Sequence, residues 1–243
     1  MSPRLFAIGG GELRLLETLA IDREIVRATG KERPNALFIG TASGDSFTYF
    51  EIFQQVYGTR LGCDTLRLIV GEGIERKLLD WADLVYVGGG NTMRMIDLWR
   101  AHGVDELLRR RFDDGMVIGG LSAGANCWFR YYNTDSPTFE GAAPGTTIRA
   151  DGLGWFEFSL CPHFLREPFR REAFIEMMKS TPGMGIAVDD GAAVEFRPGE
   201  FRVLTTNPDA SATTFQFADG RLIETRLKVA DWFPFSELSK EGT

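Results

Sequence analysis

The chain has 243 residues, of which 44% are hydrophobic, and it carries a formal net charge of −7. This apolar fraction is enough for a sizeable core, and one domain over residues 1–243 is the simplest count for the length. The negative charge argues against a nucleic-acid or anionic-membrane partner, and no apolar run is long enough to span a bilayer. Three cysteines without a C-x-x-C pair, and an N-terminus without a signal-peptide core, predict a cytoplasmic protein.

Short apolar strands alternate with helical segments through the first half of the chain. This alternation is typical of parallel βαβ units. After about residue 184 the pattern changes to short strands separated by turns, so the sequence predicts an α/β fold with a doubly wound, mostly parallel sheet and a C-terminal antiparallel extension. We expect early strands at 4–8, 36–39, 66–70, 84–87 and from 116, helices at 12–27, 47–61 and from 92, and late strands at 185–188, 192–196, 201–204, 213–217 and 221–225.

Ser122 follows one of the expected strands, in the segment GMVIGGLSAGANCWF. Residues 120–124 match the pattern G-x-S-x-G, and a helix-compatible run follows them. This strand–turn–helix context is typical of a nucleophile elbow, which needs small neighbours and holds the serine oxygen beside free N–H groups at a helix start. Ser122 is therefore the predicted nucleophile.

The chain contains two histidines that can serve as the base for Ser122. His102 stands just before Gly103 at an expected helix end, where the helix dipole favours a histidine for structural reasons. His163 follows a short apolar strand in FSLCPHFLREPF, and loops at strand ends are where open α/β sheets collect catalytic residues. We therefore expect His163 to be the base.

Two acidic segments contain candidates for orienting His163. Asp189 and Asp190 follow a strand in GIAVDDGAAVEF, and spacing alone does not distinguish between them. Asp135 lies in the turn-rich segment YYNTDSPTFEG, where it suits a contact either with the histidine or with a substrate amine. The residues alone therefore do not decide which of these three aspartates is the acidic member of the site.

A glycine loop at residues 88–90 follows an expected strand and precedes a helix. Such a loop can supply a second oxyanion donor beside the N–H group of Ala123, and Gly89 and Gly90 are the candidates. The loop lacks the G-K-[ST] ending of a phosphate loop, so nucleotide binding is a minor alternative and no cofactor is predicted. The chain also lacks the histidine-rich spacing of a zinc peptidase, so no metal is predicted.

Four blocks together, GLSAGANCWF, GGGNT, CPHF and GIAVDDGAA, resemble the peptidase E family, which hydrolyses aspartyl dipeptides and is related to the cyanophycinases. The resemblance implies a Rossmann-like α/β fold similar to class I glutamine amidotransferases. It also implies a serine nucleophile at Ser122, a base at His163 and an acid at Asp190. Better-known members of the family have Glu at this last position, so Asp190 is a departure.

The resemblance further implies a small peptide substrate with an N-terminal aspartate. An arginine suits the aspartate side chain because a guanidinium binds a carboxylate bidentately. In HFLREPFRREAF, Arg171 is the closest match to the family and Arg170 the next, and Asp135 is a candidate for contacting the substrate amine. Arg166 and Arg130 are further candidates.

Other functions stay open as alternatives. An esterase also uses G-x-S-x-G, but its histidine comes late in the chain, whereas none follows His163 here. A glutaminase of the amidotransferase type needs a cysteine where Ser122 stands, and Cys161 is a less favoured thiol nucleophile. A cyanophycinase-like peptidase and a non-catalytic binding protein are the remaining alternatives. The apolar segment VADWFPF, residues 229–235, suits either the core or a homodimer interface.

Overall fold

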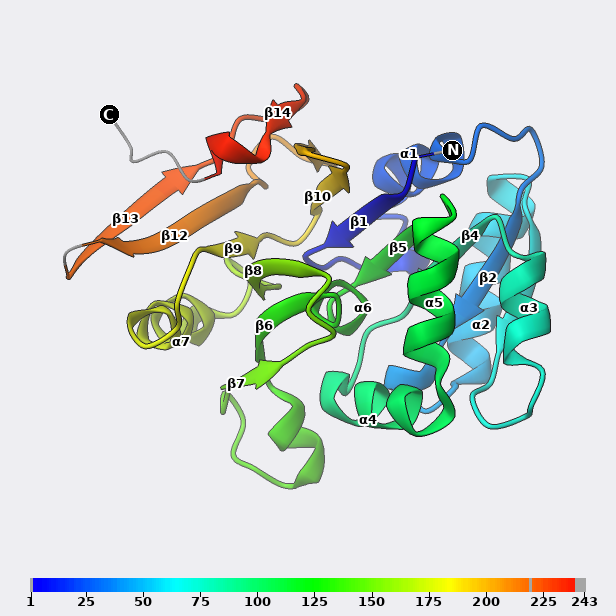
Figure 1. The fold of residues 1–243 in the computed structure, drawn as a ribbon, viewed down its shortest axis with the longest axis horizontal. Helices are drawn as coiled ribbons and strands as arrows, with labels where there is room; N and C mark the ends of the chain where they lie inside the picture. The colour runs from blue at the N-terminus through cyan, green and yellow to red at the C-terminus, as the bar shows by residue number, and fades with distance from the viewer. Residues whose placement is uncertain (1, 219, 239–243) are drawn as a thin grey trace.

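The computed structural model of the chain describes residues 2–218 and 220–238, which form two β-sheets and the helices around them (Figure 1). The first sheet consists of β1 (Arg4–Ile8), β2 (Asn35–Ile39), β3 (Asp64–Leu68), β4 (Leu84–Val87), β5 (Val117–Leu121), β10 (Ala192–Arg197), β11 (Glu200–Thr205) and β14 (Phe233–Pro234). Their order is β14-β11-β10-β1-β5-β4-β2-β3. Strands β1 to β5 pair in parallel, and β10, β11 and β14 add to β1 in antiparallel fashion. The predicted mostly parallel sheet with an antiparallel extension is confirmed.

A second sheet holds the rest of the strands in the described ranges, and the sequence pattern did not indicate it. Its members are β6 (Phe129–Thr134), β7 (Ile148–Asp151), β8 (Phe156–Cys161), β9 (Gly185–Val188), β12 (Ala212–Ala218) and β13 (Arg221–Arg226). The order is β13-β12-β9-β8-β6-β7, with β6, β8 and β9 parallel. Three of the late strands expected to extend the first sheet, those at 185–188, 213–217 and 221–225, therefore belong here. The periodicity of a strand shows which of its faces is buried. It does not show which other strand pairs with it.

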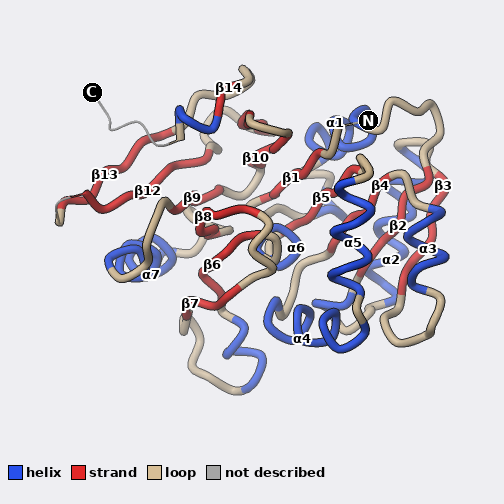
Figure 2. The backbone as a smooth tube through the Cα atoms, viewed as in Figure 1, coloured by secondary structure: helices blue, strands red, loops and turns tan. Residues whose placement is uncertain are grey.

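Helices cover both faces of the first sheet (Figure 2). Phe6 of β1 belongs to the same core as Ile25 and Phe53, whereas its neighbour Leu5 belongs to the opposite core with Leu108. This alternation is the side-chain period of a strand that is buried on both faces. The helices are α1 (Leu19–Ala28), α2 (Phe47–Phe53) with a π-helical turn over Gln54–Arg60, α3 (Glu75–Trp81), α4 (Thr92–His102), α5 (Val104–Asp113), α6 (Ala123–Asn126) and α7 (Pro168–Lys179).

Two predicted boundaries were wrong. The helix expected over 12–27 is broken: a 3₁₀ turn, η1 (Leu13–Leu15), ends at Leu16 in the left-handed region with φ 61°, and α1 starts only at Leu19. A left-handed residue cannot continue a right-handed helix, and the leucine spacing gave no sign of it. The strand expected at 66–70 runs instead over β3, two residues earlier. No helix in the described ranges is long and apolar enough to cross a membrane.

The two sheets meet where β1 ends. The carbonyl of Ile8 accepts a hydrogen bond from the Ser122 amide after β5, at 3.0 Å. The next two carbonyls, of Gly9 and Gly10, accept from the amides of His163 after β8 and Gly191 after β9, at 3.1 and 2.9 Å. Three loops from different strands are thereby tied to three consecutive residues, and they converge on one point.

Asp22 of α1 is a buried acid whose titration should be visible in the stability of the fold. Tyr57 and Thr18 donate hydrogen bonds to its two carboxylate oxygens, at 2.8 and 2.9 Å. Burial raises the pKa of Asp22 to about 7, and these two hydrogen bonds offset only part of that effect. A raised carboxyl pKa favours the folded state at low pH, and this contribution is lost as the pH rises through about 7.

We predict that Asp22→Asn removes this pH dependence. The free energy of unfolding of the wild type, relative to that of the variant, should fall as the pH is raised from about 4 to about 7 and stay level above that. Urea denaturation of both proteins at several pH values measures the difference. A difference that stays constant over this range would contradict the assignment.

Candidate active site

Ser122 occupies a strained turn between β5 and α6. Its φ and ψ are 55° and −105°, a combination that costs a non-glycine residue of order 1–3 kcal/mol and persists only where the surroundings enforce it. Both neighbouring glycines are required by close packing. A Cβ atom on Gly120 would lie 2.0 Å from the carbonyl oxygen of Gly124, and one on Gly124 would lie 2.2 Å from that of Val87.

Free backbone N–H groups lie next to Ser122 in sequence and around its pocket. Within the described residues, the amides of Ala123 and Gly90 donate to no acceptor, and the amide of Gly89 makes one long hydrogen bond, 3.4 Å, to the Tyr49 hydroxyl. Gly89, Gly90 and Ser122 line one pocket of about 310 Å³ together with His163. The predicted oxyanion residues Gly89 and Gly90 thus share a pocket with the serine.

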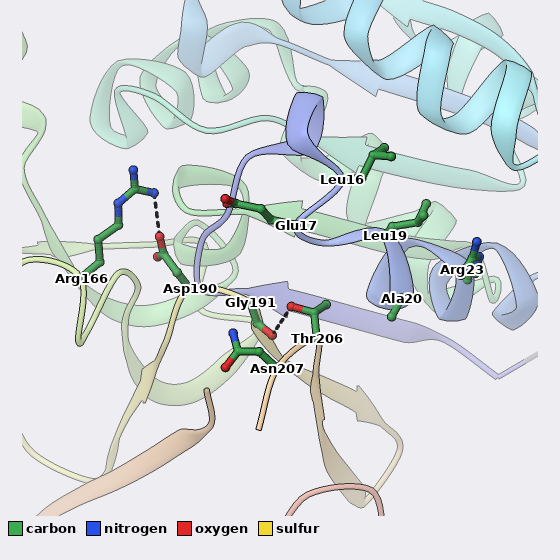
Figure 3. A pocket seen from close by; sticks show the side chains of 10 residues that line it. All are labelled: Leu16, Glu17, Leu19, Ala20, Arg23, Arg166, Asp190, Gly191, Thr206 and Asn207. Atoms are coloured by element: carbon green, nitrogen blue, oxygen red, sulfur yellow. Dashed lines mark hydrogen bonds and ion pairs between the residues drawn. The ribbon is translucent and has the colours of Figure 1, made fainter. Parts of the chain in front are cut away.

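His163 and Asp190 form a hydrogen-bonded pair, with 2.6 Å between Nδ1 and Oδ1. The other oxygen of Asp190 accepts from Arg166 at 2.8 Å (Figure 3). Burial opposes ionisation of Asp190, but the hydrogen bonds and charges of His163 and Arg166 outweigh it and hold its pKa below the ordinary value. An ionised carboxylate only accepts hydrogen bonds, so Nδ1 donates in this contact, which favours the tautomer of the neutral ring that has its lone pair on Nε2.

A second hollow, of about 700 Å³, lies against Asp190 and contains no nucleophile candidate. Arg166 and Asp190 line it together with Thr206 and Asn207 (Figure 3). Asp190 therefore contacts His163 and also lines this hollow, whose wall includes Leu16 and Leu19 as well as polar side chains.

Gly10 packs directly against this pair. A Cβ atom at Gly10 would lie 2.0 Å from Oδ1 of Asp190 and 2.4 Å from Nδ1 of His163. The N-terminal GGG turn lacks the spacing of a phosphate loop. It instead packs directly against the two side chains of the His163–Asp190 contact. Only the bare run of glycines after a strand hinted at a close approach of this kind.

The other acid candidates lie elsewhere. Asp135 pairs with Arg170, at 3.5 Å between Oδ2 and Nη2, and does not contact His163. Asp189 accepts a hydrogen bond from the Ser211 amide at 2.9 Å, and burial raises its pKa. Of the three carboxylates considered from the sequence, Asp190 is the one beside the imidazole.

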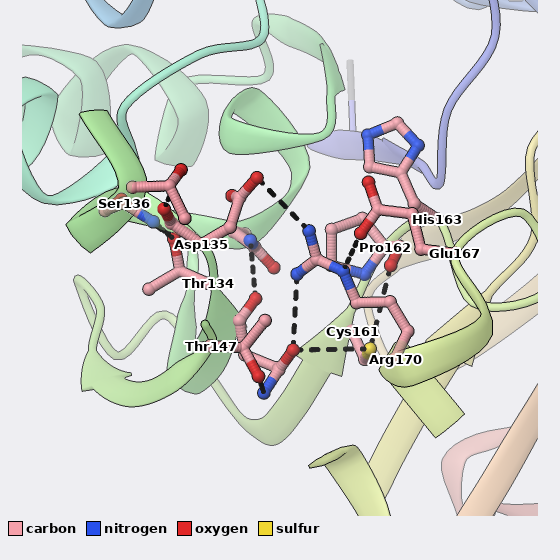
Figure 4. Close-up of polar contacts among 12 residues, drawn as sticks. Thr134, Asp135, Ser136, Thr147, Cys161, Pro162, His163, Glu167 and Arg170 are labelled. Atoms are coloured by element: carbon pink, nitrogen blue, oxygen red, sulfur yellow. Dashed lines mark hydrogen bonds and ion pairs between the residues drawn. The ribbon is translucent and has the colours of Figure 1, made fainter. Parts of the chain in front are cut away.

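Arg170 and Arg171, the arginines expected to read the substrate, do not line the Ser122 pocket. Arg170 is buried, bonded through Nε to Glu167 at 2.6 Å and through Nη1 to Asn133 at 3.2 Å (Figure 4). Figure 4 shows the ring of His163 pointing away from this cluster. Arg171 is half exposed and paired with Glu224 on β13 at 2.5 Å. Of the further candidates, Arg130 pairs with Glu157 at 2.6 Å.

The thiols are poor nucleophiles in this environment. Cys161 is fully buried, and burial raises its pKa to about 12. Burial likewise raises the pKa of Cys127 well above its ordinary value. Within the described ranges, no three His, Cys, Asp or Glu side chains converge on a point where a metal ion would bind. Of the candidate nucleophiles, the one that lines the pocket with the imidazole of His163 is therefore the hydroxyl of Ser122.

The chain is similar in sequence to several peptidases. The profile of peptidase family S51 matches residues 5–204. An uncharacterised peptidase of Bacillus subtilis, YgaJ, is 34% identical over 232 residues, which cover 93% of this chain and 97% of the relative. Peptidase E of Pasteurella multocida is 27% identical over 136 residues, covering 53% of this chain and 56% of the relative.

Solved structures share the fold. A peptidase from an acI-B1 actinobacterium superposes with a TM-score of 0.73 at 20% identity, covering 97% of this chain and 98% of that one. A putative peptidase E protein from Listeria monocytogenes superposes with a TM-score of 0.65, also at 20% identity, covering 84% and 99%. The family match and the sequence relatives define the class of protein as a hydrolase that cleaves peptide bonds. The chain belongs to peptidase family S51.

We predict that Gly10→Ala lowers peptide hydrolysis by about 100-fold or more, because the added methyl group must displace His163 or Asp190, and a shift of about 1 Å is enough for such a loss. Gly58→Ala is the matched control, since a Cβ atom there meets its nearest neighbour, Thr65, at an ordinary 3.5 Å. Both variants are assayed on a mixture of dipeptides, with thermal unfolding to check the fold. Full activity in a folded Gly10→Ala protein would contradict the geometry.

Proposed function

We propose that the chain is a serine peptidase that hydrolyses short peptides, with dipeptides bearing an N-terminal aspartate as the first substrate class. The observation that carries this proposal is the contact between His163 and Asp190 at the edge of the pocket that also holds Ser122. The aspartyl preference rests on the sequence resemblance to peptidase E. Two alternatives are a cyanophycinase-like or other short-peptide specificity and an esterase activity. Both are tested by the panel of peptides and esters described below.

In the proposed mechanism, Nε2 of His163 takes the proton of the Ser122 hydroxyl as Oγ attacks the scissile carbonyl carbon. The negative charge on the former carbonyl oxygen is stabilised by the N–H group of Ala123 and one from Gly89 or Gly90. The imidazolium gives its proton to the leaving amine as the C–N bond breaks. Water then attacks the acyl-enzyme by the same route and frees the acid and the serine. The mechanism requires no metal or cofactor.

Asp190 has two roles in this scheme. Its carboxylate holds the imidazole with the proton on Nδ1, and it stabilises the imidazolium that forms. Its lowered pKa supports both roles, because the group stays ionised well below neutral pH. The shorter aspartate side chain still reaches the imidazole, at 2.6 Å between Oδ1 and Nδ1, and the Asp190 backbone pairs with Gly10 in a bridge between chain segments.

The size of the pocket supports a short substrate. About 310 Å³ is at the lower end of the range for ligand pockets, which suits a dipeptide better than an extended polypeptide. The side chains of Tyr49, Ile52 and Leu121 give part of its lining an apolar character. Ser122 and His163 share this pocket without a hydrogen bond between them in the described structure, and in peptidases free of substrate that contact is often looser.

We predict that Ser122→Ala lowers kcat/KM by about 10⁴–10⁶-fold on every substrate the wild type cleaves, since the attacking oxygen is removed. The panel consists of an aspartyl anilide, X-Leu dipeptides and p-nitrophenyl esters. Cys161→Ala is the control and should keep its activity. Turnover that survives Ser122→Ala would refute the proposal, and wild-type turnover of esters alone would replace the peptidase by an esterase.

Asp190→Asn should lower kcat by about 10⁴-fold, because an amide stabilises the wrong tautomer and does not stabilise the imidazolium. Asp135→Asn loses only a 3.5 Å contact to Arg170 and should keep kcat within about tenfold. Steady-state kinetics on the best substrate of the panel compare the two variants. The reverse ranking would make Asp135 the acid.

A further inference from the structure

Arg14 is the cation that lines the pocket of Ser122 and His163. It stands in the 3₁₀ turn η1, directly after the glycine turn that supports the His163–Asp190 pair. Leu13 beside it is buried in the core formed with α1 and α2, and the amides of Leu15 and Glu17 both donate to the carbonyl of Glu12, at 3.0 and 3.3 Å. The backbone that carries Arg14 is therefore fixed, while its side chain is exposed at the pocket.

The three arginines that follow shortly after His163 already form ion pairs within the protein. Arg166 is bonded to Asp190, Arg170 is buried against Glu167, and Arg171 is paired with Glu224. A substrate carboxylate could engage any of them only by breaking an existing ion pair. Arg14, in contrast, has no ion-pair or hydrogen-bond partner for its side chain within the described residues.

Glu12 lines the same pocket as Arg14. Its backbone amide is bonded to the carboxylate of Glu17 at 2.8 Å, while its own carboxylate has no partner within the described part of the chain. The rim therefore presents one anionic and one cationic side chain, neither of which forms an ion pair within the described residues, although the charge of Glu12 also attracts Arg166. A short peptide with free ends carries the complementary charges, an ammonium and at least one carboxylate.

We propose that Arg14 is the specificity-determining residue that binds a carboxylate of the substrate, and that Glu12 faces its ammonium group. This inference rests on the proposed function. It places the binding of the substrate carboxylate on Arg14 in η1, whereas from the sequence we expect Arg170 or Arg171 to bind it. A guanidinium can bind a carboxylate through two parallel N–H groups, which fixes the orientation of the peptide as well as its charge. The carboxylate is either the side chain of the N-terminal residue or the C-terminus of the leaving amino acid.

The test compares three substrates and three proteins. Asp-Leu carries both carboxylates, Asn-Leu lacks the one on the side chain, and Asp-leucinamide lacks the one at the C-terminus. The wild type is compared with Arg14→Gln and with Arg76→Gln, which removes an equal charge from an exposed position on α3 outside the pocket. Thermal unfolding confirms that both variants are folded.

The proposal predicts that Arg14→Gln lowers kcat/KM for Asp-Leu by about 10–100-fold, the value of a hydrogen bond to a charged group, while Arg76→Gln stays within twofold of the wild type, about the limit for an exposed charge. The loss should disappear for the substrate that lacks the carboxylate bound by Arg14. The substrate for which it disappears shows whether Arg14 binds the side-chain carboxylate or the C-terminal one. Equal kinetics of Arg14→Gln and Arg76→Gln on all three substrates would overturn the proposal. So would a loss of carboxylate discrimination in Arg171→Gln alone.

Binding separates this inference from the proposed function. Calorimetric titration of Asp-Leu into Ser122→Ala, with and without Arg14→Gln, measures recognition without turnover. Weaker binding in the double variant supports the role of Arg14 even if the wild type cleaves none of the peptides, an outcome that would remove the serine peptidase proposal alone. Equal binding by both proteins would overturn the role of Arg14 whatever the wild type cleaves.

Discussion

The hydrogen bond between His163 and Asp190 depends on the way the two sheets meet. Each residue follows a different parallel strand of the second sheet, and the backbones of His163 and of Gly191 beside Asp190 are bonded to consecutive carbonyls at the end of β1. Gly10 allows the approach because no side chain separates β1 from the pair. The first sheet adds Ser122 through the neighbouring strand β5. The site is thus formed where the end of β1 meets the loops after β5, β8 and β9. Each backbone hydrogen bond there constrains the position of Ser122, His163 or Asp190.

Charge is distributed unevenly around this junction. Asp190 is shared between His163 and Arg166, so its negative charge is stabilised and available to the imidazole. Arg170 is neutralised inside the protein and holds the segment containing Asp135 against α7. The rim of the Ser122 pocket, in contrast, carries Glu12 and Arg14, which form no ion pair within the part of the chain that the structure describes. Paired charges therefore hold the site together, and the charges of Glu12 and Arg14 remain available to a ligand, as the proposed action on small charged peptides requires.

Local patterns predicted the parts of the molecule that local physics determines. The parallel strands, the helix after Asn91 and the glycine-flanked turn at Ser122 follow from apolar runs and small residues that are contiguous in sequence. The second sheet could not be predicted in the same way, because the pairing of β6, β8 and β9 depends on contacts between distant segments. The site divides similarly: the scarcity of histidine singled out His163, whereas the exposure of Arg171 and the burial of Arg170 depend on how α7 packs. The role of Arg14 required the pocket itself, since nothing in its flanking sequence marks it.

The proposed role of Ser122 as the activated nucleophile can be examined by covalent labelling. The wild type is incubated with a fluorophosphonate, and the labelled residue is located by mass spectrometry of its peptides. We expect one adduct per chain, on Ser122, which is lost when the His163–Asp190 pair is disrupted by Asp190→Asn. An unlabelled protein that still hydrolyses peptides, or an adduct on another residue, would contradict it.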